Sequence, residues 1–234
     1  MDFTGKTVLV TGAAGNLGRA VAQMFADRNA RLALLDQNEG ALSAAYAGET
    51  APKFECAVDL LDQAAVEDAM DKIAGSVGGP HVVCAIAGGF HMGEAVHETP
   101  EDKWALMMDM NVRTLLNTVH AAVPRMLAKG DGKIVTIGAA AARQGMAQMG
   151  AYCASKSAVI RLTESLSAEL RENSINVNCV LPSILNTPQN REAMPDADHA
   201  KWVTLPQLAN VICFLASDQA SAIHGAAIPV VGLS

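Results

Sequence analysis

Residues 7–18 read Thr-Val-Leu-Val-Thr-Gly-Ala-Ala-Gly-Asn-Leu-Gly, a β-branched run that leads through small residues into a helical pattern. Small residues let the backbone approach a pyrophosphate, and the start of a helix offers N–H groups and a favourable dipole. A glycine-rich turn alone is weak evidence, but strand, turn and helix stand here in the order that dinucleotide binding requires. The stretch predicts a nucleotide site, and the alternative interpretation is a tight structural turn. The predicted contacts are Gly12, Gly15, Asn16, Leu17 and Gly18.

Short apolar runs alternate with longer amphipathic patterns along the rest of the chain. We expect strands at 7–10, 31–35, 53–58, 81–85, 133–137, 175–180 and 227–230, and helices near 17–28, 62–75, 100–128, 150–172 and 205–217. Strands that alternate with helices indicate βαβ units in a parallel sheet, and their continuous apolar character indicates that both faces of the sheet are covered. We therefore predict one α/β domain over residues 1–234, a single doubly wound Rossmann-type parallel sheet flanked by helices.

Composition narrows the class of protein. Of the 234 residues 50% are hydrophobic and 18% charged, and the formal net charge is −7, so the chain can bury a core and offers no basic surface for nucleic acid. No apolar run approaches the length of about 18 residues that spans a bilayer, and no export signal is evident, so we expect a cytoplasmic protein without membrane contact. The isolated cysteines, with no Cys/His cluster, predict buried reduced thiols and no metal site. They are Cys56, Cys84, Cys153, Cys179 and Cys213.

Acidic residues end the second and third predicted strands. Asp36 follows the second strand, where a carboxylate can bind a ribose 2′-hydroxyl and repel a 2′-phosphate. It predicts NAD (NADH) in preference to NADP, and the alternative is a solvated strand end. Asp59 and Leu60, which close the third strand, suit a contact with the adenine edge, although one aspartate is a weak signal.

The segment Ala151-Tyr152-Cys153-Ala154-Ser155-Lys156 lies in a helical pattern. Tyr152 and Lys156 are four residues apart, so their side chains share one helix face. An ammonium nearby favours the phenolate and is expected to lower the pKa of the tyrosine. Such a tyrosine can exchange a proton with an alcohol or carbonyl oxygen while a cofactor exchanges a hydride. A coincidental surface pair is the alternative.

Taken together, these motifs resemble the short-chain dehydrogenase/reductase family along nearly the whole chain. The matching motifs are the glycine turn at 11–18, Met110-Asn111-Val112, the Tyr152–Lys156 pair, Asn178-Cys179-Val180-Leu181-Pro182 and the tail at 216–225.

The resemblance assigns roles to residues at the matching positions. It implies that Tyr152 is the acid/base, that Lys156 holds the nicotinamide ribose and tunes the tyrosine, and that Asn111 anchors a water that links the lysine to solvent. It also implies cofactor contacts around the nicotinamide and its ribose. Their positions here are Ala87, Gly88, Pro182, the backbone of Leu185, and Thr187.

The chain departs from the family at two structural positions. Asn16 takes the place of the middle glycine, and because asparagine tolerates left-handed backbone angles, we expect the turn to survive. Residues 85–88 read Ala-Ile-Ala-Gly where the family usually has Asn-Asn-Ala-Gly. The first of those asparagines braces the central sheet, and we expect apolar packing to substitute for it.

A third departure concerns the chemistry. The family's catalytic serine normally lies thirteen positions before the tyrosine, where this chain has Ala139. Loss of one donor in a preorganised site costs about 10²–10³ in rate, so ordinary ketone or alcohol chemistry is in doubt. Ser155 and Ser157 flank the lysine but cannot be assumed to replace the missing hydroxyl.

Three functions stay open at this point. The alanine at the serine position, the Ala-Gly-Gly-Phe run at 87–90 and the stretch 185–198 resemble the dihydropteridine reductase branch of the family, whose quinonoid substrate is an imine already activated for hydride. The second is an NAD(H)-dependent enzyme for a small carbonyl or alcohol, working without the serine. The third is a catalytically attenuated NAD-binding sensor or scaffold.

Two further expectations concern partners and motion. Apolar stripes at 106–123 and 159–170 permit the homodimer or homotetramer usual in the family, although they can also face the sheet. The irregular segment at about 183–204 follows a strand, where open α/β sheets bind ligands, and we expect it to form a lid over a small-molecule substrate. The alternative is an ordinary surface excursion.

Overall fold

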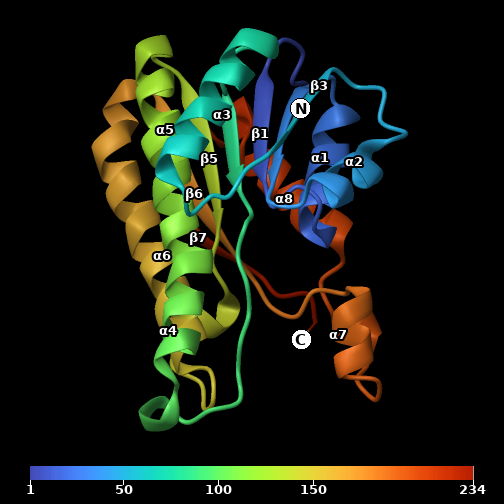
Figure 1. The fold of residues 1–234 in the computed structure, drawn as a ribbon, viewed down its shortest axis with the longest axis vertical. Helices are drawn as coiled ribbons and strands as arrows, with labels where there is room; N and C mark the ends of the chain where they lie inside the picture. The colour runs from blue at the N-terminus through green and yellow to red at the C-terminus, as the bar shows by residue number, and fades with distance from the viewer. Residues whose placement is uncertain (234) are drawn as a thin grey trace.

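A computed structural model describes residues 1–233. All seven predicted strands are present, and they form one parallel sheet in the order β3-β2-β1-β4-β5-β6-β7 (Figure 1). This confirms the predicted doubly wound sheet. The strands are β1 (Thr7–Thr11), β2 (Arg31–Asp36), β3 (Lys53–Ala57), β4 (Val82–Ala85), β5 (Gly132–Ile137), β6 (Ile175–Pro182) and β7 (Ala227–Val230).

Helices cover both faces of the sheet (Figure 1). One face carries α3 (Gln63–Ser76), α5 (Thr114–Lys129) and α6 (Gly150–Leu170), and α4 (Glu101–Met108) packs on α6. The other face carries α1 (Asn16–Ala26), α2 (Glu39–Tyr46) and α8 (Leu205–Leu215). The short helix α7 (Pro188–Ala193) lies in the connection from β6 to α8.

Each buried strand contributes side chains to two hydrophobic cores, because successive side chains point to opposite faces of a sheet. In β1, Leu9 packs into the core under α3, α5 and α6, whereas Val8 and Val10 pack into the core under α1 and α8. In β2, Leu35 and Leu34 divide in the same way. Covering on both faces explains why these strands are apolar throughout.

The strand order reverses at β1. The chain continues from β1 to β2 and β3 on one side of β1 and then crosses over to β4 on its other side. A crevice opens at such a point beyond the carboxyl ends of the strands. A polar contact ties its two walls together: the Thr11 hydroxyl accepts the N–H groups of Ile86 and Ala87 at 3.0 and 3.1 Å. The Thr11 hydroxyl thus braces this point in addition to the apolar packing that was expected there.

Two helical predictions differ from the structure. The sequence reading missed α2, a short helix that Asn38 caps by accepting the N–H of Ala41. The single helix expected at 100–128 is two helices, α4 and α5, joined by a π-helical turn at Asp109–Arg113. A π turn inserts one residue without breaking the helix, so hydrophobic periodicity does not reveal it.

Within residues 1–233, no helix combines the length and the apolar character needed to cross a bilayer. In the same part of the chain, no three His, Cys, Asp or Glu side chains gather as a group that could hold a metal ion. Four of the five cysteines are buried, as expected, and Cys56 is partly exposed.

Candidate active site

A groove of about 380 Å³ follows the crevice between the carboxyl ends of β1 and β4. It brings together every nucleotide contact that was predicted from the first, second, third and fourth strands. These residues are Gly12, Gly15, Asn16, Leu17, Gly18, Asp36, Asp59, Leu60, Ala87 and Gly88. The wall also includes residues that the sequence did not single out: Gln37, Val58, Leu61, Ile86, Met110 and Thr114.

The glycine turn is shaped by close approach of backbone to backbone. Gly12 has φ +64°, and a Cβ there would lie 3.0 Å from the Ala87 Cα. A Cβ on Gly18 would overlap the Gly12 carbonyl oxygen and lie 2.8 Å from the Ala13 Cα. The turn survives with Asn16 in the glycine position, as expected. Asn16 is the first residue of α1 and does not have a positive φ, so Gly12 and not Asn16 supplies the left-handed geometry.

Asp36 lies at the end of β2 on the groove wall. Its Oδ2 accepts the N–H of Ala14 at 2.9 Å, and its Oδ1 accepts the N–H of Asn38 at 3.2 Å. These bonds fix the carboxylate beside the glycine turn. Asp59 is held similarly, since its Oδ1 accepts the N–H of Leu61 at 2.9 Å.

Lys156 is buried and does not itself line the groove, but it lies next to Gly88, which does. Its Nζ donates to the Ile137 carbonyl at 2.9 Å, and a Cβ on Gly88 would lie 3.2 Å from the same Nζ and 2.6 Å from Asn111 Oδ1. Burial lowers the pKa of Lys156 to about 8. The ammonium therefore stands against the glycine that closes the dinucleotide groove.

Asn111 connects the loop after β4 with helix α6. Its Oδ1 accepts the N–H of Gly89 at 2.9 Å, and its Nδ2 donates to the Gly89 carbonyl at 3.1 Å and to Ser155 Oγ at 3.0 Å. The side chain comes from the π turn, which places it between the loop after β4 and helix α6. In the structure Asn111 thus holds Gly89 in place.

Tyr152 lies one turn before Lys156 on α6, as predicted. The direction of its pKa differs from the expectation: burial, followed by the neighbouring Cys153, raises the pKa of Tyr152 to about 12. The prediction that Lys156 would lower this pKa was wrong for the protein alone, because desolvation of the phenol dominates. The phenol therefore keeps its proton at neutral pH.

Neither Ser155 nor Ser157 supplies a hydroxyl in place of the missing serine. Ala139 is buried at the end of β5. Ser155 Oγ donates to the Tyr152 carbonyl at 2.9 Å and accepts from Asn111, while Ser157 Oγ donates to the Ala142 carbonyl at 2.9 Å. Both serines are used inside the scaffold.

The segment expected to form a lid leaves β6 at Pro182 and passes the predicted contacts Leu185 and Thr187. Thr187 is buried and caps α7, where its Oγ1 accepts the N–H of Asn190 at 3.2 Å. The Leu185 carbonyl accepts the Nδ2 of Asn190 at 2.8 Å.

One side-chain bond connects this segment with the glycine turn. Asn16 Nδ2 donates to Gln189 Oε1 at 2.8 Å, and the two residues stand at the first turn of α1 and on α7. The segment at 183–204 is therefore tied to the mouth of the groove, as a lid would be.

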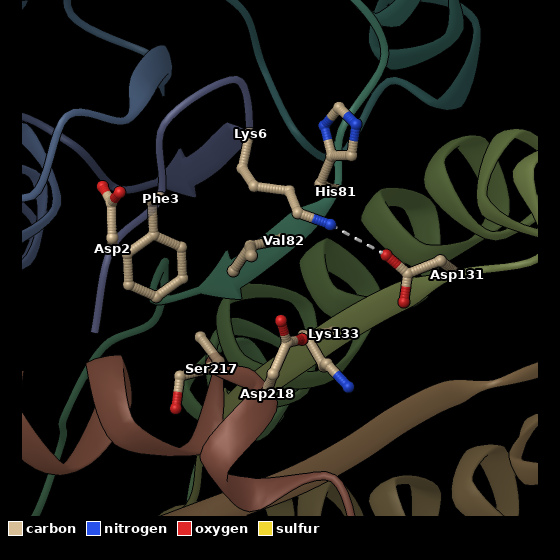
Figure 2. Close-up of a pocket in the computed structure, with 10 residues that line it drawn as sticks. Asp2, Phe3, Lys6, His81, Val82, Asp131, Lys133, Ser217 and Asp218 are labelled. Atoms are coloured by element: carbon tan, nitrogen blue, oxygen red, sulfur yellow. Dashed lines mark hydrogen bonds and ion pairs between the residues drawn. The ribbon is translucent and has the colours of Figure 1, made fainter.

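Figure 2 shows a smaller hollow, lined in part by the amino-terminal residues Asp2, Phe3 and Lys6. Its volume of about 30 Å³ is less than a tenth of the 380 Å³ of the groove. Lys6 pairs with Asp131 at 3.1 Å, and Lys133 Nζ donates to Asn176 Oδ1 at 2.5 Å. This hollow is too small for an organic ligand.

The comparisons with known proteins agree with the geometry. Residues 6–198 match the family model described as short chain dehydrogenase. The chain belongs to the short-chain dehydrogenase family. The resemblance to the dihydropteridine reductase branch stays a hypothesis.

Relatives of this short-chain dehydrogenase act on different substrates. D-threitol dehydrogenase of Mycolicibacterium smegmatis is 32% identical over 97% of this chain and 92% of its own length. A structure of NAD+-bound xylitol dehydrogenase is similar, with 26% identity, a TM-score of 0.89 and coverage of 99% of this chain and 100% of that one. Carveol dehydrogenase from Mycobacterium avium, in complex with NAD, has 26% identity, a TM-score of 0.90 and coverage of 98% and 97%.

Besides the six groove residues named above, three residues that shape this dehydrogenase's site were given no role from the sequence. Thr11 ends β1 within the quoted turn, and its position after a buried strand was the available signal. Gln189 gave no signal, because its partner Asn16 is distant in the chain. Phe90 was visible only as an aromatic residue after two glycines.

Proposed function

We propose that this short-chain dehydrogenase binds NAD(H) and moves a hydride between it and a small carbonyl, alcohol or activated imine. The observation that carries the proposal is the position of Lys156 Nζ against Gly88 at the end of the groove, one helical turn from Tyr152. The NAD-bound carveol and xylitol dehydrogenases support it, because their folds match this chain over almost its whole length.

The residues present fit a dinucleotide. The glycine turn leaves a cradle that side chains would fill, since a Cβ on Gly18 has no room. The free N–H groups at the start of α1 face a site for phosphate groups. Asp36 stands where it can bind two ribose hydroxyls, and its charge repels a 2′-phosphate, which supports NAD over NADP.

Each side chain then has a distinct task. The nicotinamide ring supplies or accepts the hydride when the cofactor is bound. Tyr152 gives its phenol proton to the substrate oxygen or nitrogen during reduction and takes it back during oxidation. Lys156 holds the ribose through its ammonium group, and Asn111 positions Gly89 and, with it, the loop that carries the substrate side.

Ala139 points to an activated substrate. With no hydroxyl at that position to polarise a carbonyl, a substrate with a conjugated imine or an electron-poor carbonyl needs less help. An activated imine such as a quinonoid dihydropteridine fits this requirement, as does an activated cyclic ketone.

A second candidate function rests on the same alanine. A chain that binds NAD and no longer turns over substrate would serve as a sensor or scaffold. Retention of Tyr152, Lys156 and Asn111 in one buried corner supports the enzyme over the sensor.

The test is Tyr152→Phe. We expect turnover in a panel of NADH-linked substrates to fall by at least about 10³-fold because the proton donor is lost, while the NADH dissociation constant changes less than twofold. Initial rates and NADH fluorescence titration measure the two quantities. Unchanged turnover would refute the acid/base role, and NADH binding without turnover by the native protein across the panel would favour the sensor.

We also propose a homodimer or homotetramer, active in the cytoplasm. Exposed apolar side chains on α4 and α5 support self-association: Trp104, Leu106 and Leu116. Light scattering coupled to gel filtration tests this, and a monomer at micromolar concentration would contradict it.

A further inference from the structure

The ring of Phe90 packs edge-on against the ring of Tyr152. Their centroids lie 4.8 Å apart at an interplanar angle of 80°, a favourable geometry for two aromatic rings. Phe90 is nevertheless 57% exposed, so much of its surface is available to another molecule beside the proposed proton donor. A single exposed apolar residue is ordinary, whereas several that gather in one place mark an interaction site.

Phe90 belongs to a wider apolar rim. The connection from β4 to α4 and the segment after β5 run side by side, since the N–H of Gly93 donates to the Gln148 carbonyl at 2.9 Å. A Cβ on Gly150 would collide with the Val96 side chain, which places the two segments in contact again at the start of α6 (Figure 1). Exposed apolar side chains on these two segments are Phe90, Met92, Val96 and Met146.

Hydroxyl groups that could bind a polar substrate are scarce at the same place. Ala139 carries none, and the hydroxyls of Ser155 and Ser157 bond to backbone carbonyls of the scaffold. The polar pair on the rim, His91 and Glu94, is internally satisfied, with Nε2 and Oε2 at 2.8 Å. A substrate rich in hydroxyls would therefore gain no hydrogen bond from Ser155 or Ser157 beside Tyr152.

We propose that the substrate is a flat, conjugated ring compound with its carbonyl or imine at one edge, and that Phe90 selects it by stacking against the ring. This inference rests on the proposed hydride transfer at the same site. It separates this chain from those relatives named for acyclic polyols, D-threitol and xylitol, and places it with enzymes for cyclic substrates. Thioether side chains such as Met92 and Met146 suit such a surface, because they adapt to the outline of a ring.

The experiment compares two ketones on the NADH-loaded protein: isatin, which is flat, cyclic and conjugated, and L-erythrulose, which is acyclic and polyhydroxylated. The variants are Phe90→Leu, which keeps an apolar side chain and removes the ring, and the control Leu127→Ala, which alters an exposed apolar residue at the distant end of α5. Equilibrium binding of each ketone is measured by calorimetry in a Tyr152→Phe background, where the bound ketone is not reduced, and turnover is measured by NADH absorbance with Tyr152 in place.

We expect isatin to bind at least tenfold more tightly than L-erythrulose, and Phe90→Leu to weaken isatin binding by about tenfold while leaving L-erythrulose and NADH unchanged. Leu127→Ala should change none of these. Equal or tighter binding of L-erythrulose, or isatin binding that Phe90→Leu does not alter, would overturn the proposal. If neither ketone is turned over, the proposed function is in question, while the two binding constants still decide the role of Phe90.

Discussion

On the β1 side of the groove, backbone atoms set the shape: Gly12 approaches the Ala87 backbone and Gly18 approaches the Gly12 carbonyl. On the α6 side, next to the groove, side chains set the shape of the site, with Tyr152 against Phe90 and Asn111 holding Gly89. The first wall tolerates almost no added atom. The second can change its surface by substitution without altering the fold, which is where relatives with one cofactor and many substrates can diverge.

The largest effect should come from Gly18→Ala. The added Cβ overlaps the Gly12 carbonyl oxygen, so the turn must move; we expect NADH affinity to fall by about 100-fold and stability to fall by about 1–3 kcal/mol. NADH titration and thermal melting measure the two effects.

Gly75→Ala is the matched control, because this glycine of α3 has no atom within 4 Å of an added Cβ. It should leave NADH binding intact and raise stability by up to about 1 kcal/mol through helix propensity. If the Gly18→Ala variant binds NADH with the affinity of the native protein, close backbone contact does not determine the shape of this side of the groove.

A second prediction concerns the charge on the same wall. Asp36→Asn keeps the shape of the side chain and removes the repulsion of a 2′-phosphate, so the preference for NADH over NADPH should fall by about tenfold or more, which equals about 1.4 kcal/mol. The ratio of kcat/KM for the two cofactors measures it. A native enzyme that prefers NADPH would refute the cofactor assignment.

The third prediction tests the α6 side by pH. Burial lowers the pKa of Lys156 to about 8, so its ammonium is present below that pH and lost above it. Because Tyr152, with a pKa of about 12, stays protonated throughout this window, kcat/KM for reduction should fall about tenfold between pH 7 and pH 9. In Lys156→Arg, which stays charged, the fall should move above pH 10 whatever the absolute rate. A profile flat from pH 7 to 10 in the native enzyme would contradict the role of the lysine.

The smallest expected effect concerns the hydrogen bond between Asn16 and Gln189 at the mouth of the groove. Gln189→Ala removes the acceptor of Asn16, an exposed hydrogen bond worth about 0.5–1 kcal/mol, so NADH should dissociate about two- to fivefold faster in stopped flow. Gln23→Ala, which removes an exposed bond to Asp27 within α1, is the control and should leave the rate unchanged. Equal rates of NADH dissociation in the two variants would show that α7 does not restrain the release of NADH.

The two walls also differ in how far the sequence predicts them. Gly12, Gly18 and Asp36 could be placed because their spacing from a buried strand determines where they lie in a βαβ unit. The raised pKa of Tyr152 could not be predicted from the sequence, since it depends on desolvation by neighbours such as Phe90 that approach from another part of the chain. The Asn16–Gln189 bond joins residues 173 positions apart, and no local pattern encodes it.

The π turn at Asp109–Arg113 makes the site sensitive to chain length at one place. A π turn holds one residue more than the α-helical winding on either side of it, so deleting one residue there restores that winding and leaves the directions of α4 and α5 largely unchanged. Asn111 would then move relative to Gly89 and Ser155. A single-codon deletion in this turn should therefore disable catalysis, although it would alter neither the glycine turn nor the pair on α6.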